Sequence, residues 1–207
     1  MDRRRFLILG SLSGVVSGLA ACGAPVNDFE ATPDVVTRTA YRHDGPPRLT
    51  LFTMVSNSSG SGAHSSLMVS ASQRVIFDPA GTVRISSIPE QGDVLFGITP
   101  YIADFYTRAH ARKTYHVVVQ ELDVSAGVAE LALQRVLANG SVAKAHCTKS
   151  TSAIMRSLPG FDGISQTWYP NKLAEQFGKM PGVKTQRLYE YDEDDKSKAL
   201  RAYVPEA

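Results

Sequence analysis

Three residues of this chain, Cys147, His64 and Asp78, have the side chains that nucleophilic catalysis by a thiol requires. The thiol attacks as a thiolate, a histidine moves the proton, and a third polar group orients the histidine. The chain holds two cysteines, and the first, Cys22, ends an apolar N-terminal segment that suggests a different use. Cys147 is therefore the candidate nucleophile.

The residues after Cys147 predict that this cysteine lies at the start of a helix. Residues 148–152 are rich in Ser and Thr, which are poor in the middle of a helix but favourable near its N-terminus. The unpaired N–H groups and the dipole at a helix N-terminus lower the pKa of a thiol. The backbone N–H of Cys147 is also a candidate donor to the oxyanion that forms during acyl transfer.

His64 and Asp78 are expected on neighbouring strands. His64 follows a Gly- and Ser-rich loop over residues 56–63 and opens a strand, and Asp78 ends the strand that begins at Arg74. Residues at matching heights on adjacent strands lie close enough to pair. Asp78 is therefore the candidate that orients His64.

The same residue types also fit simpler uses. A lone cysteine is often a small buried hydrophobe, and a lone histidine is often a polar filler. His146 precedes Cys147 directly, so their side chains should diverge on a helix or strand. A zinc site that uses Cys147 with His116 or His146 is a lesser alternative, because the paired spacing of zinc ligands is missing. The histidines that compete with His64 as the base are His43, His110, His116 and His146.

Parts of the chain resemble the circularly permuted papain-like superfamily, which includes relatives of NlpC-type cell-wall peptidases and of lecithin:retinol acyltransferase. The similar segments are Gly62–Val69, Arg74–Gly81 and Ala145–Thr151. In that superfamily a histidine at the start of a strand comes first, a polar residue of the next strand follows, and a cysteine at a helix start comes last. His64, Asp78 and Cys147 occur in this order, although His146 stands where the family's Asn-Cys-Thr type of motif has Asn.

The resemblance implies a permuted papain-like fold and a Cys147–His64–Asp78 site that acts on amide or ester bonds. Water or another acceptor can resolve the thioester intermediate of such a site. Hydrolysis and acyl transfer therefore both stay open as reactions.

The pattern along the chain predicts an α+β fold in which an antiparallel sheet packs against helices. Strand-like runs dominate the first half and helices the second, which argues against regular alternation. The expected strands are residues 49–55, 66–70, 74–78, 83–86, 115–122 and 183–191. The expected helices are residues 100–112, 126–138, 147–158 and 170–179, with Thr99 and Ser125 as N-caps of the first two.

Residues 1–21 predict an export signal, and Cys22 predicts a lipid anchor. Three arginines precede an uncharged apolar run, and Leu19–Cys22 resembles a bacterial lipobox, in which the cysteine is lipidated. Arg3–Leu7 also resembles a twin-arginine export signal. Gly23 replaces the Asp that favours retention at the inner membrane, so we expect a lipid-anchored protein that faces the periplasm, with the outer membrane favoured.

Beyond the signal, we expect a tether over residues 22–47, one α+β domain over residues 48–191 and a loosely held, charged tail over residues 192–207. Without residues 1–21 the chain has 186 residues, with 19 basic and 19 acidic side chains. That length suits one domain with a real core. The balanced charge argues against nucleic acid, which selects a basic face. We also expect no cofactor and no metal.

These features together predict an envelope-anchored thiol hydrolase with a cell-wall peptide, glycopeptide, lipid or lipoprotein-type substrate. The alternatives are an acyltransferase on the same site and a non-catalytic lipoprotein for envelope binding or assembly. Aromatic side chains can line the groove of such a binding protein, although isolated aromatics more often pack in the core, which we expect here. The aromatic residues concerned are Tyr101, Phe105, Tyr106, Trp168 and Tyr169.

Overall fold

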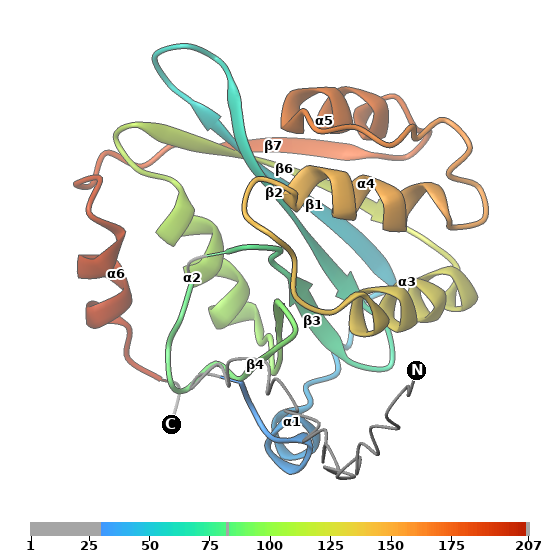
Figure 1. The fold of residues 1–207 in the computed structure, drawn as a ribbon, viewed down its shortest axis with the longest axis horizontal. Coiled ribbons are helices and arrows are strands. Elements are labelled where there is room, and N and C mark those ends of the chain that lie inside the picture. The colour runs from blue at the N-terminus through green and yellow to red at the C-terminus, as the bar shows by residue number, and fades with distance from the viewer. Residues whose placement is uncertain (1–29, 82, 206–207) are drawn as a thin grey trace, which may run out of the picture.

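The described residues form one antiparallel sheet of seven strands, in the order β4-β5-β3-β2-β1-β6-β7 (Figure 1). The computed structural model describes residues 30–81 and 83–205, so the expected signal of residues 1–21 and the expected lipid anchor at Cys22 lie outside the described residues. The strands are β1 (Arg48–Ser56), β2 (Gly62–Ser70), β3 (Arg74–Phe77), β4 (Glu90–Gln91), β5 (Val94–Leu95), β6 (Tyr115–Asp123) and β7 (Lys184–Leu188). The expected α+β class with an antiparallel sheet is confirmed.

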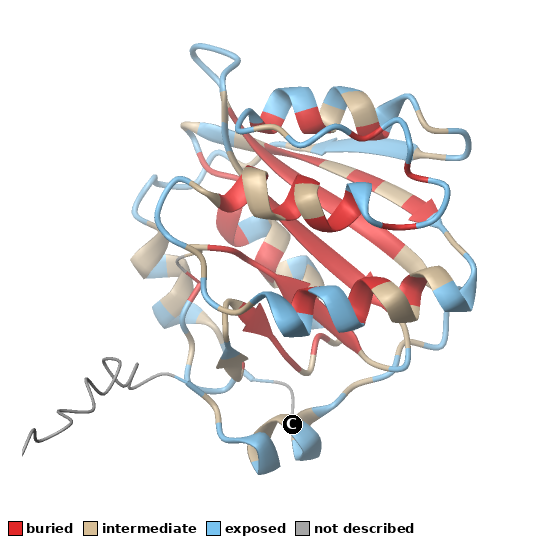
Figure 2. Cartoon of the chain, turned by 45° about the vertical axis from the view of Figure 1, so that its right-hand side comes forward, coloured by how far each residue is buried: buried red, intermediate tan, exposed pale blue. Residues whose placement is uncertain are grey.

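Helices cover both faces of the sheet (Figure 1). One face carries α3 (Ala126–Asn139), α4 (Cys147–Arg156) and α5 (Pro170–Gly178), and the other face carries α2 (Pro100–His110). The short helix α6 (Lys196–Ala202) lies beside α2, and α1 (Pro33–Thr39) lies near one end of the molecule (Figure 1). The central strands are buried from both sides as a result (Figure 2).

Alternate side chains of the central strands pack into two separate apolar cores. Leu51 and Leu67 belong to the core under α3, α4 and α5, whereas Phe52 and Met68 belong to the core under α2. Successive residues of a strand point to opposite faces, so one continuous apolar run fills both cores. This explains why β1 has apolar side chains at successive positions, as in Leu51–Phe52 and Met54–Val55, in place of strict alternation.

The strand β2 extends beyond the end of β3, and this leaves a notch in the sheet. Residues 67–70 of β2 pair with β3, whereas residues 62 and 64–66 pair with β1 only and Ala63 forms a bulge between them. We call residues 62–66 the notch. The side chains of a strand alternate between the two faces. Helices from both faces therefore reach the notch, α4 at Ser65 and α2 at Ser66.

The predicted helix starts at Thr99 and Ser125 are confirmed. The Thr99 side chain accepts a hydrogen bond from the backbone N–H of Ile102, and that of Ser125 accepts one from Val128. Each bond satisfies one of the N–H groups that a helix leaves unpaired at its first turn.

Two parts of the strand prediction are wrong. Residues 83–86 do not form a strand, since Ile85 makes only an isolated bridge to Ile88. The small hairpin of β4 and β5 was not expected, because strands of two residues are too short to show an alternating pattern. Gly92 and Asp93 turn this hairpin with positive φ angles of 59° and 63°.

The segments on either side of the expected domain also contact it. Within the expected tether, the backbone of Ala31 bonds to Glu90 and the carbonyl of Tyr41 accepts from Arg74. Within the expected tail, α6 precedes Tyr203, whose ring packs against Tyr101 and Phe105 of α2. The contacts of the domain thus extend beyond residues 48–191 at both ends.

Candidate active site

Cys147 is the first residue of α4, and its side chain lies against β2 at the notch. The N-cap, His146, makes no side-chain cap, so no capping side chain occupies the N–H groups of the first turn. The hydroxyl of Thr148 lies 3.8 Å from Sγ of Cys147 and donates to Oγ of Ser65 at 3.1 Å. The expected place of the thiol at a helix start is confirmed, and Cys147 is only 8% exposed.

His64 and Asp78 are in direct contact. Nε2 of His64 lies 2.6 Å from Oδ1 of Asp78, which is 4% exposed. The sequence suggested that the two residues lie at matching heights on their strands, and this part of the prediction is wrong. The β2–β3 pairing ends at Leu67 and Phe77, so Asp78 is level with Ser66, and His64 lies two residues further on the same face. The contact is therefore a diagonal one, which side chains as long as these can bridge.

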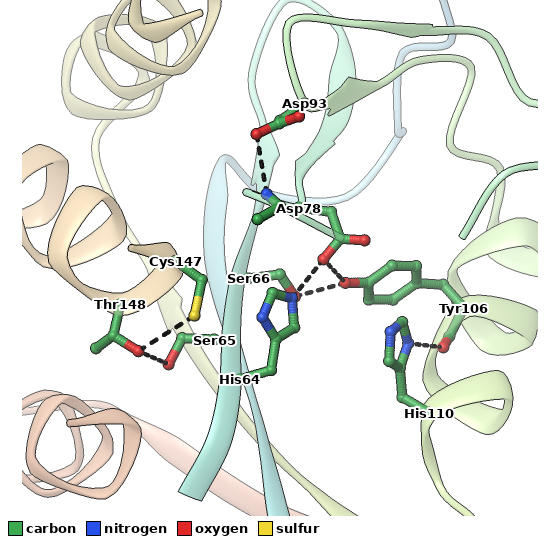
Figure 3. Close-up of polar contacts among 10 residues, drawn as sticks. His64, Ser65, Ser66, Asp78, Asp93, Tyr106, His110, Cys147 and Thr148 are labelled. Atoms are coloured by element: carbon green, nitrogen blue, oxygen red, sulfur yellow. Dashed lines mark hydrogen bonds and ion pairs between the residues drawn. The ribbon is translucent and has the colours of Figure 1, made fainter. Parts of the chain in front are cut away.

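The ring of His64 lies between the carboxylate of Asp78 and the sulfur of Cys147 (Figure 3). Burial alone lowers the pKa of His64, but hydrogen bonds and charges from Asp78 and Cys147 outweigh it and raise the pKa to about 9. Burial likewise opposes ionisation of Cys147, yet His64 and the backbone of Ser65 lower the pKa of the thiol to about 7. A thiolate–imidazolium pair is consequently the favoured state between pH 7 and 9.

Asp78 is held by a second hydrogen bond from the opposite side. The hydroxyl of Tyr106 lies 2.8 Å from Oδ1 of Asp78 and 2.7 Å from Oγ of Ser66. A carboxylate only accepts, so the phenol proton goes to Asp78 and the serine hydroxyl donates to the phenol oxygen. Burial opposes the charge, but His64 and Tyr106 keep the pKa of Asp78 well below its usual range. The carboxylate is therefore ionised although it is buried.

The turn after β3 fixes the backbone on which Asp78 stands. The N–H of Asp78 donates to the carbonyl of Asp93, and the Asp93 carboxylate accepts from the N–H groups of Ala80 and Val142. A Cβ at Gly81 would overlap Oδ2 of Asp78, so this position has room only for glycine. The β4–β5 hairpin thus holds the backbone of Asp78 in place through Asp93 (Figure 3).

The competing histidines have other partners. The ring of His116 donates from Nδ1 to the amide oxygen of Asn57 and stacks on Tyr189, and the ring of His146 packs edge-on against Trp168. The side chains of His146 and Cys147 do diverge, as expected. Among the described residues, no group of three or more His, Cys, Asp and Glu side chains is placed to hold a metal ion.

The sequence indicated His110 only as a competing base and Tyr106 only as a core aromatic, and it did not predict that both lie at the site beside His64 and Asp78. Both lie on α2, four residues apart and therefore on one helix face, and they pack against each other with ring centroids 4.5 Å apart. His110 Nδ1 is 2.8 Å from the backbone oxygen of Tyr106, and its ring faces His64 with centroids 6.2 Å apart. The i, i+4 spacing of two polar aromatic residues is the signal that could have indicated them.

The expectation that the aromatic residues pack in the core is confirmed only for Tyr106, which is 1% exposed. Trp168 and Tyr169, in the loop before α5, are 49% and 73% exposed, and Tyr101 is 41% exposed. The indole of Trp168 lies between His146 and the ammonium group of Lys149, which sits 4.6 Å from its centroid. Trp168 therefore borders the cysteine end of the site, since His146 directly precedes Cys147.

Comparisons with models of protein families, with curated proteins and with solved structures found no match. Across the described part of the chain, no helix is long and apolar enough to cross a membrane.

Proposed function

We propose that this protein is a thiol hydrolase that cleaves amide or ester bonds through Cys147, His64 and Asp78. The observation that carries the proposal is the contact chain from Asp78 through the His64 ring to Cys147 at the start of α4. A buried carboxylate, an imidazole and a thiol of lowered pKa in this order are what covalent acyl transfer requires. The same order supports a permuted papain-like fold.

The reaction would run through a thioester. The thiolate of Cys147 attacks the carbonyl carbon of the substrate, and the protonated ring of His64 gives its proton to the leaving group. The backbone N–H of Cys147, at a helix start, is the candidate donor to the oxyanion. Water then attacks the thioester, passes its proton to His64 and releases the acid.

The expected lipid anchor at Cys22 would place this site in the bacterial envelope, facing the periplasm, with the outer membrane favoured. An anchored enzyme meets cell-wall peptides, glycopeptides, lipids and lipoproteins. An acyltransferase that uses the same three residues is the second candidate function, and a cavity of about 320 Å³ that His64 helps to line, with room for an acceptor, is the observation that favours it.

Alkylation of Cys147 by iodoacetamide as a function of pH tests the site. We expect the labelling rate of the folded protein to rise with pH with a midpoint near 7, because the pairing with His64 lowers the pKa of the thiol more than burial raises it. His64→Asn should raise this midpoint toward or above the ordinary thiol value of about 8.5. Labelling that occurs only after denaturation would overturn the proposal and identify Cys147 as a structural residue.

Envelope preparations test the function itself. Purified protein and its Cys147→Ser variant are incubated separately with envelopes, and the released and modified products are compared by mass spectrometry. Products with one added water support hydrolysis, and products in which an acyl group has moved support transfer. Identical profiles for both proteins would favour the non-catalytic binding or assembly lipoprotein.

A further inference from the structure

Two large aromatic side chains, Trp168 and Tyr169, are exposed at the end of the segment that connects α4 to α5. The indole of Trp168 is half exposed, and the ring of Tyr169 is largely exposed. Rings of this size usually bury most of their surface, either in the core or against a partner. The cavity that His64 helps to line includes neither ring. Trp168 and Tyr169 therefore form a separate surface, which we call the aromatic rim.

The aromatic rim is held between α4 and α5 by hydrogen bonds. The N–H of Thr167, which precedes the rim, donates to Oγ of Ser152 at 3.0 Å, and Ser152 is fully buried on α4. The side chain of Gln166 donates to the carbonyl of Lys149 at 3.4 Å. The carbonyl of Tyr169 accepts from N–H groups of the first turn of α5. The backbone of the rim is thus held in place before a ligand binds, which lowers the entropic cost of binding.

The aromatic rim lies beside the nucleophile. At one end, the indole of Trp168 contacts the ring of His146, which directly precedes Cys147, with ring centroids 4.6 Å apart. At the other end, Pro170 packs on Gly62 of the notch, since a Cβ at Gly62 would lie 2.7 Å from Cβ of Pro170. The rim therefore lies next to the thiol, on the face of the sheet that carries α4.

This place relates the rim to the acyl half of the proposed reaction. The acyl carbon of the substrate becomes bonded to Sγ of Cys147, whereas the leaving group takes its proton from His64. The cavity that His64 helps to line lies toward α2, because Ala109 and His110 of that helix form part of its wall. The rim lies on the opposite side of the sheet, with the thiol. The acyl group is therefore the part of a substrate that the rim can contact.

Three polar side chains around the rim are engaged within the protein. Asn171 donates to the carbonyl of Gly60, and Oγ1 of Thr167 accepts the N–H of Tyr169. The ammonium group of Lys149 lies 4.6 Å from the centroid of the indole. A sugar needs hydrogen-bond partners for its hydroxyl groups, whereas an apolar chain needs only apolar surface. The rim offers mainly ring surface, which favours an apolar chain.

We infer that the aromatic rim is the subsite for the acyl group of the substrate, and that it takes an unbranched apolar acyl chain. The inference rests on the proposed function of the Cys147 site. In the acylation step, the sulfur of Cys147 bonds to the acyl carbon, the bond from that carbon to the leaving group breaks, and the proton of His64 goes to the leaving group. The chain on the acyl carbon then covers part of both rings, which removes apolar surface from water.

The rates at which 4-nitrophenyl acetate, butyrate and hexanoate acylate Cys147 test this inference on the full chain. Release of nitrophenolate gives each rate, and mass spectrometry confirms the acylated residue. Each rate is divided by that of the same ester with free 2-mercaptoethanol, which removes differences in chemical reactivity. A fully buried methylene group contributes about a fourfold increase, so partial cover of the longer chain should give hexanoate about a tenfold advantage over acetate. The ester of N-acetylglycine, a polar and peptide-like acyl group, should lack this advantage.

Variants of the two rings locate the effect at the rim. Trp168→Ala should lower the advantage of hexanoate over acetate about fivefold and leave the acetate rate nearly unchanged, and Tyr169→Ala should lower it about twofold. Trp168→Phe keeps a ring and should retain most of the advantage. Tyr191→Ala removes a more exposed ring from the C-terminal segment, so it is the matched control and should keep the wild-type ratio. The pH midpoint of Cys147 alkylation should be the same in all four variants, which separates loss of the subsite from a change at the thiol.

The outcomes separate the two proposals. Failure of every ester to acylate Cys147 would overturn the proposed function and this inference together. Acylation whose rate does not rise with chain length would overturn the inference alone, and so would a larger advantage for the N-acetylglycine ester, which would point to a peptide substrate. A hexanoate advantage that persists in both Trp168→Ala and Tyr169→Ala would also overturn it, because the chain would then bind elsewhere.

Discussion

The pairing of Cys147 with His64 should be visible in the pH dependence of folding stability. Between pH 7 and 9 the folded protein carries its proton on His64 and has an ionised Cys147. The unfolded chain has a neutral histidine, with an ordinary pKa of 6.5, and a protonated thiol, with an ordinary pKa of 9.0. Both states hold one proton on this pair, so the pair contributes no slope of stability against pH in this window.

Cys147→Ser removes the thiol of this pair, so that only His64 still titrates. His64 then keeps its raised pKa only through Asp78, so that pKa falls below 9 but stays above 6.5. A group with a raised folded pKa stabilises the protein fully below its unfolded pKa and loses this contribution as pH rises. The full rise of the His64 pKa from 6.5 to about 9 corresponds to about 3 kcal/mol, so the part that Asp78 alone maintains is worth less than this.

Urea unfolding at pH 6, 7, 8 and 9 measures this effect. The quantity compared is the difference in free energy of unfolding between wild type and Cys147→Ser, because the contributions of other titrating groups cancel in that difference. We expect the wild type to gain about 1–3 kcal/mol over the variant as pH rises from 7 to 9. The double variant His64→Asn/Cys147→Ser should lack the downward slope of Cys147→Ser. Parallel curves for wild type and Cys147→Ser would refute the ion pair, whatever the activity of the protein.

Three further outcomes follow from the site and the anchor. Tyr106→Phe should lower the free energy of unfolding by about 1.5–3 kcal/mol in urea at pH 7, because it removes a hydrogen bond to a buried carboxylate. The loss should be the same at pH 5, since that carboxylate stays ionised well below its usual pKa. Gly81→Ala should displace the same carboxylate, cost about 1–3 kcal/mol and raise the midpoint of thiol alkylation, whereas Gly127→Ala, at an open helix position, should not. Cys22→Ser should move the protein from the membrane fraction to the soluble fraction on immunoblots, and unchanged membrane association would contradict the lipid anchor.

Some parts of the site follow from the sequence because the signals are local. The Ser- and Thr-rich run after Cys147 indicates a helix start, and Thr99 indicates the start of α2, the helix that carries Tyr106. Once that helix is placed, the spacing of Tyr106 and His110 puts both on one face. These features depend on contacts between residues that are close in the chain.

Other parts depend on register, which the sequence does not display. The diagonal contact of His64 with Asp78 exists because β3 ends level with Leu67 of β2. The need for Gly81 exists because the turn folds back onto the carboxylate that precedes it. Trp168 was expected in the core, yet half of it is exposed, because a loop position has no periodicity that separates buried from exposed side chains.

The notch makes the site sensitive to the register of β2. The thiol comes from α4 on one face of the sheet, and the hydrogen bond of Tyr106 to Asp78 comes from α2 on the other face. A slip of one residue would turn His64 to the face of Ser65 and break its contact with Asp78, because neighbouring side chains point to opposite faces. The carboxylate of Asp93 bonds the turn after β3 to the loop before α4, through Ala80 and Val142. This small braced turn therefore fixes the sheet register and the distance to the α4 helix together, so changes at Asp93 should disturb both halves of the site at once.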